Sequence, residues 1–170
     1  AQRDITMAAT GDLTLSSAAN EQHTYNKSKK VTTSTDKITQ VATMVHSGGN
    51  VSLSAGNDME IVASRIEGAG DVDIDAGRDL LVTSAKDEDA SSYLKKSKGS
   101  SGRRKTTQKE SYDSTNVASV IEAGRNLTVN ASLSDKGGVS LEGGHDVTVI
   151  GSQLKAGNNL VLGALNNVSV

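Results

Sequence analysis

Three features of the amino-acid sequence predict an all-β fold, a right-handed parallel β-helix with about 21 residues and three short strands per coil. First, apolar and polar residues alternate with a period of two, which is the pattern of half-buried strands. Second, an Asn or Asp precedes these strands at alternating short and long steps, as from Asn50 to Asp58, then to Asp71 and to Asp79. Third, the chain has 17 Gly and only 2% aromatic residues, which favours thin stacked layers of aliphatic side chains.

The repeated unit has a leading residue with apolar residues one and three positions after it. The leading residues are Asp4, Asp12, Asn50, Asp58, Asp71, Asp79, Asn126, Gly138, Asp146, Asn159 and Asn167. Each long step contains a third strand, marked by an aliphatic residue five positions before the leading residue: Val45, Ile66, Ile121, Leu133 and Leu154. A β-sandwich also contains short strands, but it does not require a fixed alternation of short and long steps.

The corners between strands contain Gly together with Asn or Asp. Gly provides the left-handed or otherwise strained backbone that such corners need, and Asn or Asp bonds the backbone of the corner. One coil is irregular, because the long step from Asn126 to Gly138 follows another long step. Either a coil lacks a strand there or residues 116–119 fill its place, and the sequence leaves both possibilities open.

Two insertions, at about residues 16–44 and 85–119, interrupt an otherwise single β-helical segment that spans residues 1–170. Both follow the second strand of a pair joined by a short step, so we expect them to leave the same corner of the coil. Each has a Tyr before a Lys cluster and then a Ser/Thr-rich stretch. They rejoin the coils through segments that match position by position, 40–45 against 116–121.

We expect each insertion to form a β-hairpin arm with a polar turn, at residues 99–102 in the second arm and near 32–35 in the first. A flexible polar loop is the alternative. The first insertion has four Lys and two acids, and the second has eight Lys or Arg and five acids, giving +2 and +3. Since the whole chain carries −2, the coils carry about −7.

Basic arms on acidic coils favour contact with lipopolysaccharide, sulfated glycan or phospholipid headgroups, and a solvated surface is the alternative. The candidate contact residues are Tyr25, Lys27, Lys29, Lys30, Tyr93, Lys95, Lys96, Lys98, Arg103, Arg104 and Lys105. Nucleic acid is not an expected partner, because the overall charge is −2 and the basic run at 103–105 has no interleaved aromatic residue.

No catalytic, metal or cofactor site is expected. Asp71, Asp73 and Asp75 alternate, and Asp73 and Asp75 should point outward from one strand, close enough for general acid–base chemistry on a polysaccharide, but the chain has no Trp to bind a sugar. The three His, at 23, 46 and 145, lack the spacing of zinc ligands. No apolar run approaches the ~18 residues of a membrane-spanning helix.

Several phrases carry a family resemblance: Ala-Gly-Arg-Asp-Leu at 76–80, Ala-Gly-Arg-Asn-Leu-Thr-Val at 123–129 and Gly-Gly-His-Asp-Val-Thr-Val at 143–149. They resemble the haemagglutinin repeats of filamentous haemagglutinin-like exoproteins. The insertions with Tyr-x-Lys-x-Lys-Lys at 25–30 are similar to the second repeat class of these proteins, which is typical of contact-dependent growth inhibition (CdiA-type) effectors.

This resemblance implies a bacterial exoprotein that is exported by two-partner secretion, through an outer-membrane secretion partner, and remains at the cell surface. In growth-inhibition effectors the repeat region is thought to engage the target outer membrane and to help pass a C-terminal toxin. Since residues 3–7 already form a repeat unit, we expect this chain to be a segment of a longer protein and to stack on neighbouring coils. A host-cell adhesin and, less favoured, a polysaccharide-degrading enzyme are the alternatives.

Overall fold

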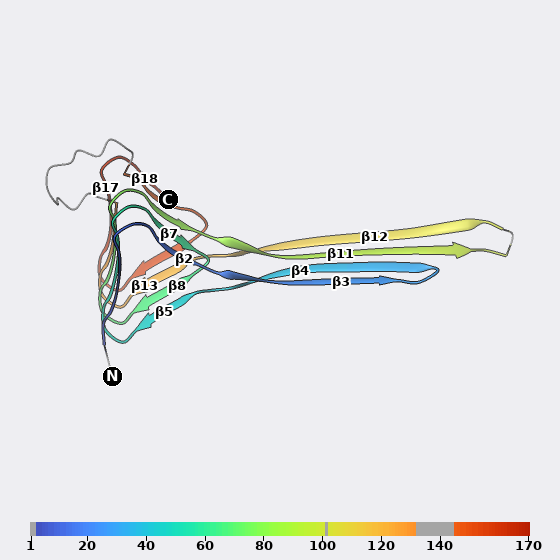
Figure 1. Ribbon diagram of the computed structural model, residues 1–170, viewed down its shortest axis with the longest axis horizontal. Helices are drawn as coiled ribbons and strands as arrows, with labels where there is room; N and C mark the ends of the chain where they lie inside the picture. Colours follow the sequence, from blue (N-terminus) through green and yellow to red (C-terminus); the bar gives the residue numbers. More distant parts are fainter. Residues whose placement is uncertain (1–2, 101, 132–144) are drawn as a thin grey trace. The chain divides into compact units, whose positions relative to one another are not determined.

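The computed structural model describes residues 3–100, 102–131 and 145–170, and in these ranges it contains strands and no helix (Figure 1). The chain divides into two compact units. The first, here called the coil unit, comprises Ala1–Ser17, Ala42–Ala85 and Ala118–Val170, and the second, the arm unit, comprises Ala18–Val41 and Lys86–Val117.

The coil unit contains three parallel sheets. The first consists of β1 (Ile5–Ala9), β6 (Val51–Ala55), β9 (Val72–Ala76), β14 (Leu127–Ala131) and β17 (Leu160–Ala164). The second consists of β2 (Leu13–Ser16), β7 (Met59–Val62), β10 (Leu80–Thr83), β15 (Val147–Val149) and β18 (Val168–Ser169). The third consists of β5 (Met44–Ser47), β8 (Arg65–Gly68), β13 (Val120–Ala123) and β16 (Gln153–Ala156).

The register of these sheets shows the length of one coil. Val51 pairs with Val72 in the first sheet, and Met59 pairs with Leu80 in the second, so an uninterrupted coil has the length expected from the sequence. Each coil places one strand in each sheet, and all pairings within the coil unit are parallel. The predicted β-helix is therefore confirmed. Its right-handed sense stays a prediction, supported by the right-handedness of parallel crossovers.

The core consists of aliphatic side chains stacked from coil to coil. In the third sheet Ile66 pairs with Ile121, and both are fully buried. The strands alternate buried and more exposed residues, as the period of two predicts. Residues of the outer coils are partly buried against this core: Ile5, Met7, Leu13, Leu15, Leu154, Ala156, Leu162 and Ala164.

The Ala-Gly corners, such as those of Gly56 and Gly124, are explained by close packing of coils and not by a left-handed backbone, whereas Gly151, at the corner between β15 and β16, has the left-handed backbone expected from the sequence. A Cβ on Gly56 would overlap the carbonyl oxygen of Thr10 in the preceding coil, and a Cβ on Gly124 would overlap that of Ala69. Neither corner glycine has a positive φ. In the described part of the chain, the glycines with positive φ are Gly102 and Gly151.

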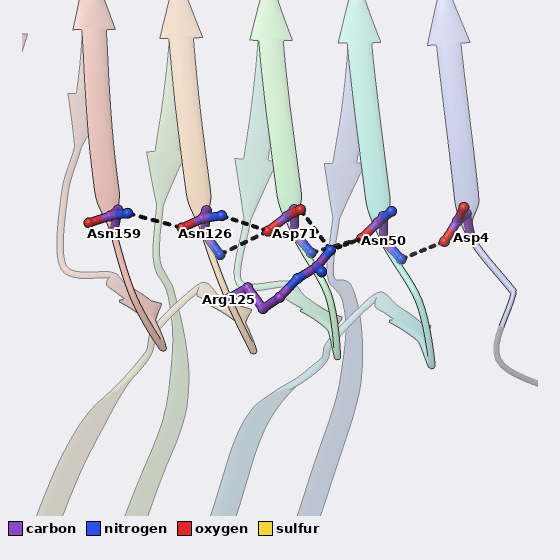
Figure 2. A network of polar contacts seen from close by, with 6 residues as sticks. All are labelled: Asp4, Asn50, Asp71, Arg125, Asn126 and Asn159. Carbon is purple, nitrogen blue, oxygen red and sulfur yellow. Dashed lines mark hydrogen bonds and ion pairs between the residues drawn. The ribbon is translucent and has the colours of Figure 1, made fainter.

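The leading Asn and Asp residues before the first sheet form a ladder that bonds successive coils (Figure 2). The Asn50 amide donates to Asp4 Oδ1 (2.7 Å), and the Asp71 amide donates to Asn50 Oδ1 (2.9 Å). The Asn126 amide donates to Asp71 Oδ1 (3.1 Å), and Asn159 Nδ2 donates to Asn126 Oδ1 (3.2 Å). These side chains therefore bond the next coil, whereas the sequence suggested bonds within each corner.

A second ladder precedes the strands of the second sheet and is built in the same way. Its members are Asp12, Asp58, Asp79, Asp146 and Asn167, and each of the last four donates its amide to the carboxylate before it. Arginines add a contact to each ladder: Arg78 bonds Asp58, and Arg125 bonds Asp71 (2.8 Å). The hydrogen bond from Arg78 lowers the pKa of the Asp58 carboxyl.

The irregular coil contains all three strands. After β14 its second strand is β15, which pairs with β10, so neither interpretation of the irregularity was correct. Asn116 and Val117 end a strand of the arm unit and do not fill a place in the coil. The expected repeat positions Leu133 and Gly138 lie outside the described residues.

A hydroxyl group closes the coil where each insertion leaves and returns. Thr43 Oγ1 donates to the Ser16 carbonyl (2.7 Å), and Ser119 Oγ donates to the Thr83 carbonyl (2.6 Å). In the two described coils without an insertion at this corner, Ser64 and Ser152 each make the equivalent bond to the carbonyl two residues before (2.8 and 3.0 Å). The same local bond therefore forms whether one residue or an entire hairpin separates the two groups.

The arm unit is an antiparallel sheet with the order β12-β11-β4-β3 (Figure 1). Its strands are β3 (Ala18–Lys27), β4 (Val31–Val41), β11 (Ala85–Lys98) and β12 (Arg104–Val117). Each insertion is a hairpin, as predicted, but the two hairpins are not separate. Strands β4 and β11 pair over eight residues, from Glu88 opposite Ile38 to Lys95 opposite Val31.

The two hairpin turns differ in how well the sequence predicts them. In the second hairpin the Gly99 amide donates to the Arg103 carbonyl (2.8 Å), within the expected turn region. In the first, the Ser28 amide donates to the Val31 carbonyl (2.7 Å), and residues 32–35 belong to β4. The expected turn near 32–35 was therefore wrong by about four residues. The turn begins at Ser28, and Ser is a residue type that favours turns.

Candidate interaction surface

The charges of the arm sheet are separated along its strands. The half that contains both turns, residues 22–35 and 90–109, has ten Lys or Arg and no Asp or Glu. We call this half the basic end; its cations are Lys27, Lys29, Lys30, Lys95, Lys96, Lys98, Arg103, Arg104, Lys105 and Lys109. The remaining half, the acidic end, has seven carboxylates and two Lys. A charge of +10 thus adjoins a charge of −5 in one sheet.

The basic end contains a cleft of about 470 Å³. Its lining residues are Lys29, Lys30, Lys96, Ser97, Lys98, Arg104, Lys105 and Thr106. The Lys96 amide donates to the Lys30 carbonyl (2.8 Å), which places the first turn beside β11. In residues 3–100, 102–131 and 145–170, none of the six lining cations makes an ion pair with a carboxylate. The cleft therefore offers six unneutralised charges and two hydroxyls to an anion.

The two tyrosines that the sequence grouped with the cations lie on opposite faces of the sheet. Tyr25 is opposite Ser34, which is in turn opposite Ser92, and the Ser34 and Ser92 hydroxyls are 2.9 Å apart. Tyr93 is opposite Thr33, one position along β4. Because successive side chains of a strand point to opposite faces, the tyrosines do not form one aromatic pair. Tyr25 is 65% exposed.

The structure brings together six of the eleven candidate residues in the cleft. The other five lie outside its lining: Tyr25, Lys27, Tyr93, Lys95 and Arg103. Sequence reasoning missed the lining residues Ser97 and Thr106, since a hydroxyl side chain in a Ser/Thr-rich stretch gives no signal of its own. Only the strand register, which the Ser97 hydroxyl bond to the Lys105 carbonyl reports, places them together.

At the acidic end, carboxylates have partners within the arm unit. His23 Nδ1 lies 2.8 Å from Asp36 Oδ1, and its Nε2 lies 3.6 Å from Glu21. The bond to Asp36, and secondly that to Glu21, raises the pKa of His23. Tyr112 donates its hydroxyl to Glu88 (3.0 Å). These carboxylates thus stabilise the arm itself, whereas the cations of the cleft have no such partners in the described residues.

The carboxylates considered for catalysis lie on β9 of the coil unit. Asp73 is exposed and Asp75 is half-buried. Burial, and secondly the charge of Asp73, raises the pKa of Asp75. All three Tyr of the chain, at 25, 93 and 112, belong to the arm unit, so the coil unit itself has no Tyr, Trp or Phe to bind a sugar beside these carboxylates. A raised pKa alone does not make a site.

The residues that the structure describes contain neither a metal-binding cluster nor a membrane-spanning helix. Within those ranges, no three His, Cys, Asp or Glu side chains converge to hold a metal ion. His23 and His46 each contact carboxylates, and the imidazole of His145 is buried. No helix there is long and apolar enough to cross a membrane.

Three-stranded coils interrupted by charged hairpins define the class of the protein, a β-helical repeat stalk. The family model named Hemagglutinin repeat matches residues 29–102 and 98–170, and the chain therefore belongs to this family. The predicted filamentous haemagglutinin-like relationship is confirmed at this level. Members of this family are secreted or cell-surface proteins with structural and adhesive roles. No curated protein and no solved structure matched the chain.

The two family matches begin at residues 29 and 98, which lie at or beside the turns of the two hairpins. One family repeat thus extends from the turn of one hairpin to the turn of the next. It includes β4, the coil strands that follow and β11. The hairpins are therefore a regular part of the repeat.

Proposed function

We propose that the chain is a non-enzymatic stalk segment from the repeat region of a contact-dependent growth inhibition effector. In this role the arms engage the outer membrane of the target cell and help to deliver a C-terminal toxin. The observation that carries the proposal is the charge separation within the arm, with ten cations and no carboxylate at the end that contains both turns. A surface exoprotein that only spans distance does not require this arrangement.

An anionic bacterial surface fits the basic end in physical terms. Each Lys or Arg close to an anionic membrane contributes about 1 kcal/mol, and the contribution is lost beyond a Debye length of about 8 Å at physiological salt. Six of the ten cations at the basic end line a single cleft, and none of these six makes an ion pair with a carboxylate of the described residues. Phosphate groups of lipopolysaccharide match this charge, and the lining hydroxyls of Ser97 and Thr106 are able to donate to their oxygens.

The second candidate is a host-cell adhesin that binds sulfated glycan through the same cleft. Arg104 among the lining cations suits sulfate as well as phosphate, because guanidinium groups bind both tetrahedral anions through paired hydrogen bonds. Both candidates use one surface, so the ligand decides between them. The polysaccharide-degrading enzyme has no comparable support, since no aromatic side chain accompanies Asp73 and Asp75.

The test compares two double variants with the same change in net charge. Lys29→Ser/Lys96→Ser removes two cations from the cleft, and Lys37→Ser/Lys86→Ser removes two from the acidic end. Binding is measured on vesicles that contain lipopolysaccharide and on immobilised heparin, at 50 and 150 mM salt. We expect the cleft variant to bind the vesicles about tenfold or more weakly, and the control variant to differ by less than about twofold.

Equal losses in the two variants would contradict a role for the cleft. Retention on heparin without vesicle binding would favour the adhesin. Delivery itself is tested in the parent exoprotein, where Lys29→Ser/Lys96→Ser is expected to reduce killing of target cells while surface display stays unchanged. Unchanged killing by that variant would remove the delivery role of the arms.

A further inference from the structure

The pairing of β4 with β11 joins two different insertions of the chain. Strand β4 is the second strand of the first hairpin, and β11 is the first strand of the second hairpin. Eight residue pairs are in register, the Ser34 and Ser92 hydroxyls are 2.9 Å apart, and the Gln40 amide donates to Asp87 Oδ1 (2.6 Å). Polar strands of this repeat therefore pair between hairpins, and an apolar face is not needed.

The outer strands of the arm sheet each have one edge without a neighbouring strand in the described residues. One of these edges belongs to the first strand of an insertion, and the other belongs to the last strand of an insertion. Strands β3 and β11 are each the first strand of an insertion. Equivalent positions in them are separated by the same number of residues as Asp12 and Asp79. Strands β4 and β12 are each the last strand of an insertion. Equivalent positions in them are separated by the same number of residues as segments 40–45 and 116–121. The open edges thus repeat the types of strand that pair at the centre of the sheet.

We propose that the open edge of β12 pairs antiparallel with the β3 edge of a second copy of this arm. This inference goes beyond the proposed function, because it concerns how arms associate and not which anion they bind. The central pairing predicts the register. Applying the same two offsets to the β4–β11 pairs places residues 107–114 of β12 against residues 21–28, which comprise most of β3 and the position after it.

The charges along this predicted register are compatible. Glu110 would lie opposite Tyr25, and Lys109 would lie opposite Asn26, with no two like charges directly opposed over the eight pairs. Both strands are almost entirely exposed, so their outer backbone amides and carbonyls are accessible to a partner strand. In contrast, β4 and β11 include many half-buried residues because each has a neighbour on both sides.

The contact uses two different edges, so it does not close on itself. A second arm that occupies the β12 edge leaves its own β12 edge open for a third arm, and the sheet extends. The basic ends of successive arms would lie side by side, since the strands stay antiparallel and in register. Ten cations per arm would thereby form a continuous strip.

Disulfide cross-linking tests this pairing, and the chain has no native Cys. By the same two offsets, Ser34 corresponds to Glu110 and Ser92 corresponds to Tyr25. The variants Glu110→Cys and Tyr25→Cys are therefore made in separate chains and mixed. We expect the mixture to form a cross-linked dimer at least fivefold faster than either variant alone. The control mixture of Ser111→Cys with Tyr25→Cys is shifted by one residue, which points the two thiols to opposite faces.

The variant Ser34→Cys/Ser92→Cys provides a benchmark within one chain, because those hydroxyls are already in contact. Circular dichroism of each variant confirms that the strands are intact. Equal rates in the matched and shifted mixtures would overturn the proposal. It would also be overturned if no intermolecular disulfide formed at about 100 μM chain under conditions that fully oxidise the benchmark.

Discussion

The coil unit and the arm unit are both built from β-strands but are stabilised in different ways. In the coil unit, strands such as β6 and β9 bury every second residue, and the buried side chains form aliphatic stacks. In the arm unit, all ten residues of β3 are exposed, and the sheet has polar side chains on both faces. Apolar burial, at about 25 cal/mol per Å², therefore stabilises the coils and contributes little to the arm.

This difference separates what the folding of each unit depends on. The coil unit depends on neighbouring coils, because each aliphatic side chain is covered by the equivalent residue before and after it. The arm unit depends on backbone hydrogen bonds and on polar pairs across strands, such as the one between Ser34 and Ser92. Substitutions on the arm surface should consequently have little effect on folding, and substitutions in the core of the coils should destabilise the fold.

The largest effect is expected from Ile121→Ala. Ile121 is fully buried between Ile66 and Leu154 of the adjacent coils, so the change removes buried apolar groups and leaves a cavity. We expect the free energy of unfolding to fall by about 2–5 kcal/mol, measured by urea denaturation with circular dichroism. The control, Tyr25→Ala at an exposed arm position, is expected to change it by less than about 0.5 kcal/mol. Comparable losses in both variants would refute the contrast between the units.

A smaller effect is expected from Asp71→Ala in the ladder of Figure 2. Asp71 Oδ1 accepts bonds from the amide and the side chain of Asn126, and its Oδ2 contacts Arg125. The Ala variant leaves the Asn126 amide without this acceptor, at a cost of about 1–3 kcal/mol in unfolding free energy.

Asp71→Asn is the matched control for that change. It keeps the Oδ1 acceptor, as the natural Asn50 does one coil earlier, and loses only a half-exposed ion pair worth about 1 kcal/mol or less. The same urea titration measures both variants. If Asn were as harmful as Ala, the ladder would depend on charge and not on the bond between coils.

The contrast between the units also explains what the sequence predicts well. The fold of the coils follows from a local pattern, because each strand repeats the same alternation and each leading Asn or Asp marks a corner. Val45, Ile66, Ile121 and Leu154 all lie in the third sheet as expected. The reason for the corner glycines was missed, since the overlap of a Cβ at Gly56 with Thr10 depends on how closely two coils stack.

The arm unit was harder to predict because its pairing is not local. Ser and Thr alternate with few apolar residues in β4, so no buried face fixes the register, and the first turn was placed in residues that belong to the strand. The pairing of β4 with β11 joins residues far apart in the sequence, and no periodic pattern in the sequence indicates it. The basic residues were recognised from composition, whereas the cleft that unites six of them required the sheet order.

The smallest expected effect is a pH response of His23 in the arm unit. The hydrogen bond to Asp36, and secondly that to Glu21, raises the pKa of His23 above its ordinary value of 6.5. Protonated His23 therefore stabilises the folded arm below pH 6.5, and this contribution is lost as the pH rises through the higher pKa of the folded state. NMR titration of the imidazole is expected to give a midpoint above 6.5.

Asp36→Asn should lower the pKa of His23 most of the way back toward its ordinary value. Glu21→Gln should lower this pKa less, because the bond to Asp36 is the larger cause of the raised value. An unshifted midpoint in the natural chain would show that the carboxylates of the acidic end do not bind His23 in solution.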